Sequence, residues 1–227
     1  MKRKYILKIL KRTGWPLGCL VFLVACNTNA SYKEFKPTAA DSSRYEKKIE
    51  NAFNSIKQLS KLVQNGDIIT RTGNDFTSYG LRTLNRRDIT YSHCGIASIE
   101  NDSLFVYHAL GGEFNPDQKL LRQSFTEFSE PFSNNGIGIF RYADPLVGQK
   151  APGIAAEYYR IGVPFDMDFD METDDRMYCA EFVVKALEKS SGEIRVNRSR
   201  IGTFRFAGVD DIFLHPGTRK VASIVYK

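Results

Sequence analysis

The chain has 227 residues, enough for one compact domain with a leader and a tether, and its 42% apolar fraction is ordinary for a protein with a hydrophobic core. A formal charge of +6 would favour nucleic acid as a partner if it were spread over the domain. However, six of the 32 basic residues lie within residues 1–25, which hold no acidic residue, and the other 26 balance the 26 acidic residues. We therefore exclude nucleic acid as the expected partner.

Residues 1–25 have the build of a secretory signal peptide, with a basic start and an apolar stretch that is shorter than the roughly 20 residues of a membrane-spanning helix. The junction Leu23-Val24-Ala25-Cys26 resembles the lipobox of bacterial lipoproteins. That resemblance implies cleavage before Cys26 and its acylation, which would anchor the chain stably to a membrane. Asn27 favours the outer membrane of a bacterial envelope. An uncleaved anchor and an ordinary secretory signal are the alternatives.

The polar residues 26–43 are expected to form a flexible, lipidated tether, and residues 44–227 a single domain. Apolar residues at helical spacing predict an amphipathic helix over 45–62, and the polar, arginine-rich residues 72–90 predict a loop. The pattern is that of an α+β domain, an antiparallel sheet packed with helices. Further strands are expected at 67–71, 91–100, 103–110, 137–142 and 221–226, and further helices at 123–130, 154–161 and 180–190.

Two histidines lie in the expected hairpin, whose strands are joined by Asn101-Asp102. Because successive side chains of a strand point to opposite faces, His93 and Cys94 face apart, and Cys94 is expected to pack in the core. A turn centred on Asn101-Asp102 places residue 95 opposite His108, so the two imidazoles become diagonal neighbours on one face. A pair of imidazoles above a glycine favours a functional site.

Cys179 is the candidate nucleophile because it lies where a helix is expected to begin. The unpaired N–H groups and the positive dipole end of a helix start favour a thiolate, and they can hold the oxyanion of a tetrahedral intermediate. His93 is the candidate base, and His108 is the polar group that orients it. Tyr178 is assigned to packing with a partial role at the oxyanion. Glu181 either caps the helix or recognises a substrate amine.

These residues allow three other interpretations. Cys94 and Cys179 could form a disulfide in an oxidising compartment. His93, His108 and Cys179 could be three ligands of a zinc-binding or structural module, although no compact zinc-ligand spacing is present. The acidic residues of 166–177 resemble a calcium loop but lack its required glycine and its final glutamate. No metal is therefore assigned.

Four segments of residues 66–185 carry a resemblance to a known family. They read Gly66-Asp67-Ile68-Ile69, Tyr91-Ser92-His93-Cys94-Gly95-Ile96, Gly162-Val163-Pro164-Phe165-Asp166 and Tyr178-Cys179-Ala180-Glu181-Phe182-Val183. In sequence and order they resemble the NlpC-type papain-like hydrolases of the circularly permuted, YiiX/YebB-like branch. In that branch the histidine comes early and the cysteine late, the reverse of papain.

The resemblance implies a circularly permuted papain-like fold, with a cysteine nucleophile that matches Cys179 and a base that matches His93. It also implies a polar third residue on the following strand, which is His108 here. Relatives often have glutamate at that position, and a neutral imidazole orients the base less strongly than a carboxylate. Ala180 is a second departure, because a small hydroxyl residue is common there.

These residues predict a cysteine hydrolase, an amidase or peptidase that needs no metal or other cofactor. An envelope location makes cell-wall peptides the expected substrates. A lipid acyltransferase or thioesterase is the alternative, because the lecithin retinol acyltransferase family shares the permuted order and has two histidines before the cysteine. An apolar groove beside Cys179 would favour lipid, and a narrow polar cleft would favour peptide. A non-catalytic binding domain is the last alternative.

Overall fold

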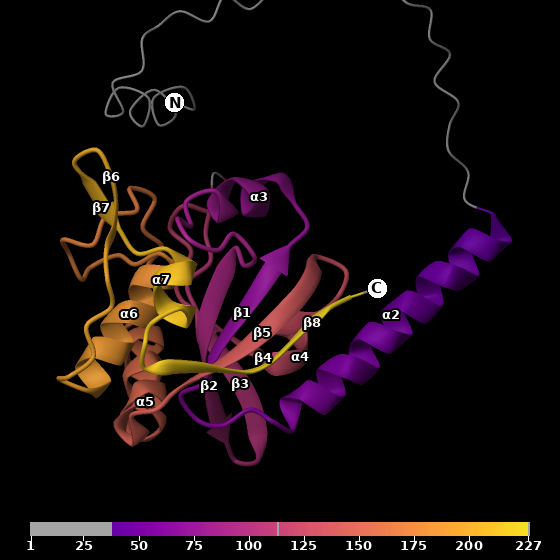
Figure 1. Cartoon of the computed structure of the whole chain (residues 1–227), viewed down its shortest axis with the longest axis horizontal. Helices are drawn as coiled ribbons and strands as arrows, with labels where there is room; N and C mark the ends of the chain where they lie inside the picture. Colours follow the sequence, from indigo (N-terminus) through magenta and orange to yellow (C-terminus); the bar gives the residue numbers. More distant parts are fainter. Residues whose placement is uncertain (1–37, 113, 227) are drawn as a thin grey trace, which may run out of the picture.

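The computed structural model describes residues 38–112 and 114–226, so the predicted signal peptide, Cys26 and most of the tether lie outside it. Its centre is a six-stranded antiparallel sheet (Figure 1). In sheet order the strands are β4 (Leu121–Ser124), β3 (Ser103–His108), β2 (His93–Glu100), β1 (Ile68–Gly73), β5 (Asn134–Tyr142) and β8 (Thr218–Val225). None of the helices within the described residues has both the length and the apolar composition to cross a bilayer.

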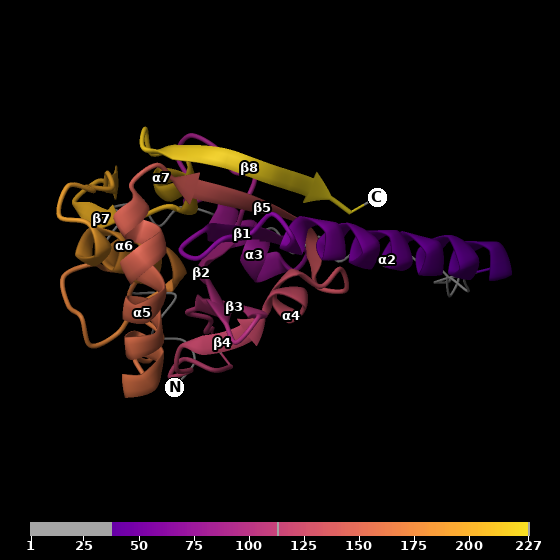
Figure 2. The same ribbon diagram turned by 90° about the horizontal axis from the view of Figure 1, so that it is seen from below.

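Helices cover both faces of the sheet (Figure 2). On one face pack α5 (Pro145–Ile161) and α6 (Cys179–Ser190), and on the other α2 (Ala39–Ser60) and α4 (Phe125–Ser129). The alternation of strand side chains divides the core accordingly, because Ile68 belongs to the first cluster and the adjacent Ile69 to the second. The predicted α+β class with an antiparallel sheet is confirmed.

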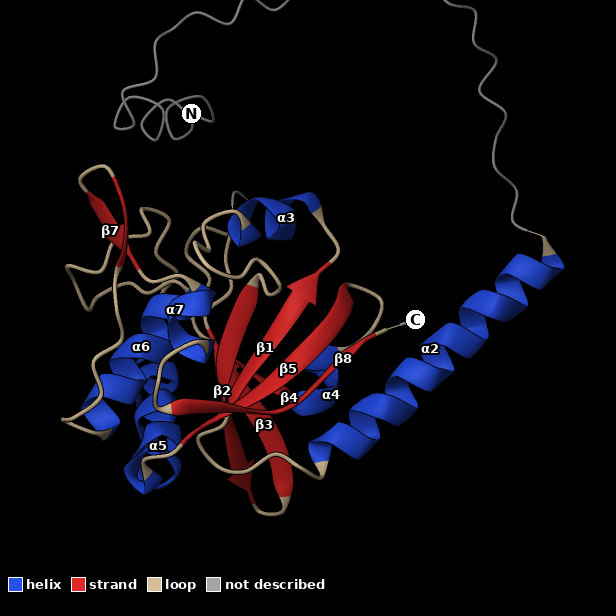
Figure 3. Cartoon of the chain, in the orientation of Figure 1, coloured by secondary structure: helices blue, strands red, loops and turns tan. Residues whose placement is uncertain are grey.

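Smaller elements gather at the end of the sheet where β1 ends and β2 begins (Figure 3). They are α3 (Phe76–Arg82), the two-stranded hairpin of β6 (Ser199–Ile201) and β7 (Phe204–Phe206), and α7 (Val209–Phe213). Sequence patterns predicted none of these four elements. Each is too short for a periodic apolar pattern, so packing against the larger elements determines them.

The β2–β3 hairpin has the predicted register. Asn101 and Asp102 adopt positive φ angles of 47° and 63°, as the two central residues of a type I′ turn require. Asn and Asp tolerate this conformation better than other non-glycine residues. The ladder runs from Glu100 opposite Ser103 to Ile96 opposite Tyr107, and its continuation places residue 95 opposite residue 108.

The first helix begins earlier than predicted, and this corrects the tether boundary. α2 begins at Ala39, so residues 39–43 are helical rather than part of a flexible tether. The reason is a capping box at Thr38. The Asp41 N–H donates to Thr38 Oγ1 at 3.1 Å, and the Thr38 N–H donates to Asp41 Oδ2 at 3.0 Å.

Three other expectations are corrected. The predicted loop 72–90 contains α3, whose first turn is capped by Asp75. The predicted helix 123–130 is divided between β4 and α4. α5 begins at Pro145 rather than at 154, although Pro152 lies inside it. Val147 and Ala151 are buried in that early part, so tertiary packing outweighs the low helix propensity of proline.

Candidate active site

Cys179 is the first residue of α6, and its side chain is only 7% exposed. A hydrogen bond from the Ala180 backbone N–H to the sulfur acts to lower the thiol pKa. This is one of the N–H groups that a helix start leaves without an intrahelical partner. The helix start therefore presents the sulfur to donors that favour its thiolate, as the sequence predicted.

Cys94 is the immediate neighbour of the candidate nucleophile. The pKa of Cys179 lies below its ordinary value, first because the Cys94 side chain is hydrogen-bonded to its sulfur, against the opposing effect of burial. The N–H groups of Cys94 and Ala180 and the charge of Arg71 act in the same direction. Burial, followed by the interaction with Cys179, raises the pKa of Cys94 well above its ordinary value. Cys94 thus stays protonated as the donor, and both cysteines are free rather than bridged.

The two imidazoles of the hairpin meet, as the register predicted. His93 Nε2 lies 2.9 Å from His108 Nδ1, and the ring planes are nearly perpendicular at 88°. Both side chains are buried. Gly95 makes the room, because a Cβ at that position would lie 2.6 Å from the Tyr107 carbonyl oxygen and 3.0 Å from His108 Cβ.

A third polar side chain extends this pair and sets its protonation. Gln123 Oε1, on β4, lies 2.8 Å from His108 Nε2. An amide oxygen accepts only, so His108 carries its proton on Nε2 and presents an unprotonated Nδ1 to its partner. His93 must then donate from its own Nε2. The chain leaves His93 Nδ1 unprotonated, which is the state that a general base needs.

Both histidines are neutral in the folded protein. Burial first, the positive charge of Arg71 second and His108 third hold the pKa of His93 well below its ordinary value. Burial and Arg71 lower the pKa of His108 to about 3, against the opposing hydrogen bond of Gln123. Both imidazoles are therefore free to accept a proton near pH 7, while the same shifts make each of them a weaker base than a free imidazole.

The structure brings Cys179 to the strand segment that carries His93. The Cys94 thiol and N–H lie close enough to the Cys179 sulfur to lower its pKa, and Ser92 lines the same pocket as Cys179, so the residues on both sides of His93 lie near the nucleophile. The His93 ring packs on the opposite face, with its centroid 5.8 Å from that of Phe128. Among residues 38–112 and 114–226 no direct hydrogen bond joins Cys179 to His93.

The structure gives Tyr178 and Glu181 supporting positions. The Tyr178 hydroxyl accepts the Ala207 N–H at 2.7 Å, so it braces the loop before α7 rather than pointing a free donor at an oxyanion. Glu181 accepts the Tyr178 N–H at 3.2 Å and caps α6. Lys185 forms an ion pair with Glu181 at 2.9 Å, while burial raises the Glu181 pKa to about 7. Glu181 thus caps the helix, which is the first of its two predicted roles.

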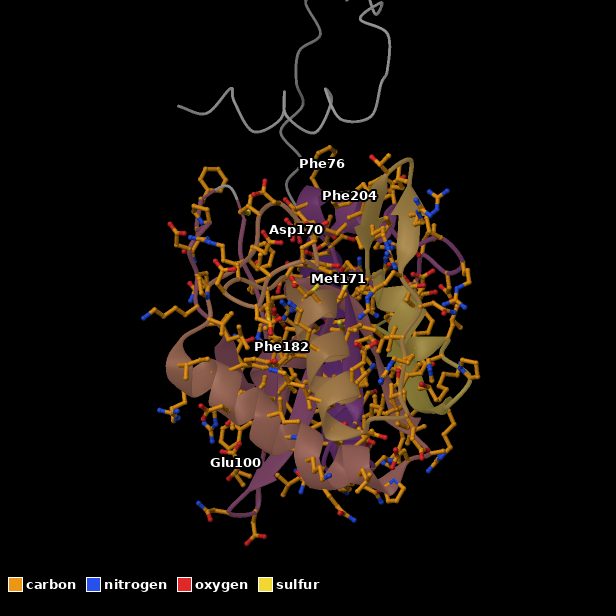
Figure 4. All side chains as sticks on the ribbon, turned by 90° about the vertical axis from the view of Figure 1, so that its left-hand side faces the viewer. Phe76, Glu100, Asp170, Met171, Phe182 and Phe204 are labelled. Carbon is orange, nitrogen blue, oxygen red and sulfur yellow. The ribbon has the colours of Figure 1, made fainter. Side chains whose placement is uncertain are left out.

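A narrow pocket adjoins Cys179 at the end of the sheet where α3 and the β6–β7 hairpin lie. Its volume is about 30 Å³, room for one or two water molecules. Figure 4 shows Phe76 and Phe204 at this end of the molecule and Glu100 at the opposite end. The polar lining comes from Asn85, Ser92 and Tyr178. The large apolar lining residues are Leu81, Leu84, Phe169, Phe204, Phe206 and Val209.

Two polar residues of this region were missed by the sequence analysis. Arg71 was assigned to a strand without a role, and Gln123 to a helix. The signal for Arg71 was its position on the strand that precedes the hairpin, because β1 pairs with β2 and places Arg71 opposite His93. Gln123 had no such signal, since β4 was itself not predicted.

Comparisons with known proteins agree with this fold. The model of a family described as permuted papain-like amidase enzymes, YaeF/YiiX, C92 family, matches residues 62–208. The protein YiiX of Escherichia coli (strain K12) is 26% identical over 140 residues, which are 61% of this chain and 64% of YiiX, just under two thirds of that relative.

The solved structure described as metalloprotein yiiX from Escherichia coli O157:H7 has the same fold. It matches with a TM-score of 0.57 and 21% sequence identity, over 71% of this chain and 98% of that chain. The match to the family model covers well over half of the sequence, and the chain therefore belongs to the permuted papain-like amidase family.

Proposed function

We propose that this chain is a cysteine amidase in which Cys179 attacks an amide carbonyl. His93 Nδ1 takes the thiol proton and later returns it to the leaving amine. The Cys179 backbone N–H helps to hold the oxyanion of the tetrahedral intermediate. Water then hydrolyses the thioester with His93 again as the base, which restores the thiol and releases a carboxylic acid. His108 acts as a positioning residue that keeps the proton of His93 on Nε2.

The hydrogen-bond chain from Gln123 through His108 to His93 is the observation that carries this proposal. Two histidines that merely pack in a core need not have their protons ordered in one direction. Here the hydrogen-bond chain ends at the Gln123 oxygen, which orders the protons and leaves His93 Nδ1 free to accept one. That nitrogen belongs to the residue between Ser92 and Cys94, which both adjoin the candidate nucleophile. Cys179 and His93 lie on opposite faces of the strand, so the proposal requires His93 Nδ1 to reach the sulfur when substrate binds, through a bridging water molecule or a rotation of the ring at the start of β2.

The direct test is alkylation of the purified protein with iodoacetamide across pH 5 to 9, with the modified residue identified by mass spectrometry. We expect Cys179 to react faster near neutral pH than a model thiol of pKa about 8.5, because its thiolate is favoured. Cys94 should stay unmodified and serves as the internal control. A Cys179 that reacts no faster than the model thiol would contradict an activated nucleophile. Loss of amide hydrolysis in a folded Cys179→Ala variant would exclude a non-catalytic binding domain.

For the substrate we infer a cell-wall peptide or a related amide of the envelope, from the expected location and the family. The lining of the pocket beside Cys179 is mostly apolar, which supports the second candidate, an acylated substrate, provided that the pocket of about 30 Å³ opens to admit the chain. A matched pair separates them: a short peptide amide and the same amide carrying a long N-acyl chain. A lower KM for the acylated compound would favour the lipid-like substrate, and a preference for the peptide would favour cell wall.

The membrane anchor is a proposal that rests on the sequence of residues 1–43. We expect the mature chain to fractionate with membranes and to incorporate a labelled fatty acid at Cys26. A Cys26→Ser variant should lose the label and appear in the soluble fraction. Labelling that persists in this variant would contradict the lipobox.

The solved relative is described as a metalloprotein, but the side chains of this chain do not fit a resident metal ion. In the part of the chain that the structure describes, no three His, Cys, Asp or Glu side chains gather to hold an ion. The two imidazoles bond to each other, and Asp166 accepts the N–H groups of Asp168 and Asp170 at 2.8 and 3.0 Å. These residues do not fit a metal centre, and no step of the proposed reaction passes through one.

A further inference from the structure

Arg71 lies beside His93 and has no role in the reaction as described so far. It pairs with His93 in the ladder between β1 and β2, so the two side chains extend from the same face of the sheet. The guanidinium lies over the Phe128 ring, with Cζ 4.6 Å from the centroid. The ring of Phe128 also contacts both imidazoles, at centroid distances of 5.8 and 5.0 Å. One aromatic side chain thus holds Arg71 beside the two histidines.

The charge of Arg71 has no carboxylate partner among the described residues. Its Nη1 donates to the Phe128 carbonyl oxygen at 3.0 Å, and no salt bridge involves it. The two carboxylates whose charge acts on Arg71 are those of Glu130 and Asp75, and both accept hydrogen bonds from other groups. Glu130 accepts the Phe132 N–H at 2.6 Å, and Asp75 accepts the Ser78 N–H at 2.9 Å.

Another arginine of the same sheet, Arg141, forms the carboxylate pair that Arg71 lacks in the described part of the chain. Arg141 binds both carboxylate oxygens of Asp67, at 2.6 and 2.7 Å. Arg71, by contrast, donates one hydrogen bond among the described residues, so most of its five N–H donors are available to a ligand. Its side chain is only part-buried. A guanidinium is the side chain best suited to bind a carboxylate through two parallel hydrogen bonds.

We propose that Arg71 binds a carboxylate of the substrate, close to the carbonyl that Cys179 attacks. The inference rests on the proposed function and narrows its substrate class to amides that carry a carboxylate near the scissile bond. The acyl or apolar part would then lie toward the pocket formed by α3 and the β6–β7 hairpin. Arg71 would lie on the side of His93 and determine specificity through charge.

The same contact would also serve the chemistry. Burial and then the charge of Arg71 keep the pKa of His93 low in the free protein. A bound carboxylate offsets the charge of Arg71, so His93 accepts the proton of Cys179 more readily when the substrate is present. The charge of Arg71 also favours the Cys179 thiolate before substrate binds. A carboxylate substrate would therefore trigger proton transfer, whereas a neutral amide would not.

Two alkylating reagents test the inference without knowledge of the natural substrate. Iodoacetate carries a carboxylate and iodoacetamide does not, and both modify the same sulfur. We expect the ratio of their rates at Cys179 to fall about tenfold in Arg71→Gln, which corresponds to a loss of about 1.4 kcal/mol of attraction between the guanidinium and the carboxylate. Arg71→Lys should retain part of the preference. Arg160→Gln is the matched control, because Arg160 is exposed and pairs with Glu157 on α5.

The outcomes separate this inference from the proposed function. A rapid reaction of Cys179 with iodoacetamide, combined with an equal rate ratio in Arg71→Gln and the unsubstituted protein, would overturn the role of Arg71 alone. A Cys179 that is slow toward iodoacetamide would overturn the proposed function, and this inference with it. If Arg71→Gln does not fold, the role of Arg71 can be tested in the unsubstituted protein, by the protection of Cys179 from iodoacetamide by small ligands. N-acetylglycine should protect Cys179 from iodoacetamide at lower concentration than neutral N-acetylglycinamide, and equal protection would contradict the inference.

Discussion

The acceptor on β4 gives the sharpest test of the candidate site. Replacing Gln123 with Leu removes the oxygen that lies 2.8 Å from His108 Nε2, with a side chain of similar size. The Nε2–H of His108 then has no protein acceptor, and nothing holds the proton on that nitrogen. We expect both imidazoles to populate the opposite tautomer, in which His93 Nδ1 is protonated and cannot act as a base.

The magnitude follows from one hydrogen bond. A side-chain hydrogen bond contributes about 1 kcal/mol, and Gln123 is part-buried, so water can replace some of it. A preference of about 1.4 kcal/mol corresponds to a factor of ten between the two tautomers. Loss of this preference leaves the two tautomers about equally populated, so we expect amide hydrolysis to fall about twofold and Tm to fall by only about 2–4 °C, since that is the shift per kcal/mol for a domain of this size.

The assay is long-range ¹H–¹⁵N NMR of the imidazole nitrogens, which distinguishes a protonated from an unprotonated ring nitrogen. The chain contains only three histidines, so the spectrum can be assigned by single substitutions. Gln123→Glu keeps an acceptor and should retain the original tautomers. Gln58→Leu, at an exposed position of α2, controls for a leucine elsewhere. Unchanged tautomers and unchanged hydrolysis in Gln123→Leu would refute the reasoning.

Three further outcomes are expected. His108, whose pKa burial lowers to about 3, binds a proton below pH 6.5 only in the unfolded chain, so its contribution to stability is lost as the pH falls from 6.5 toward 3. His108→Asn should reduce the slope of the unfolding free energy against pH by about 1.4 kcal/mol per pH unit. Denaturant titrations at pH 6 and pH 5 measure this slope, and the same slope in the variant and the unsubstituted protein would contradict the prediction. Cys94→Ala removes the donor to Cys179, so its pKa should rise and its alkylation by iodoacetamide at pH 7 should slow about threefold to tenfold; an unshifted pH profile would contradict the role of Cys94. Tyr178→Phe leaves the Ala207 N–H without its acceptor and should cost about 1–3 kcal/mol of unfolding free energy, whereas alkylation of Cys179 should not change; the reverse result would restore an oxyanion role for the hydroxyl.

Local sequence determined the parts of the site that depend on short-range rules. A two-residue Asn-Asp turn leaves one register for the hairpin, and a strand alternates its faces, so the meeting of His93 with His108 could be predicted. The apolar spacing after Cys179 likewise predicted α6 to within one residue at its start. These features depend on residues that are close to each other in the sequence.

The tertiary structure decided what lies around those residues. Gln123 and Arg71 reach the imidazoles because β4 and β1 pair on either side of the β2–β3 hairpin, and a pattern along one strand carries no information about its neighbours. Cys94 was expected on the face away from His93 and lies there, but its contact with Cys179 depends on how α6 packs across the sheet. The apolar pocket joins α3, the β6–β7 hairpin and the start of α6, segments separated by most of the domain. Non-local packing brings such segments together, so only the folded chain shows which groups surround the candidate nucleophile.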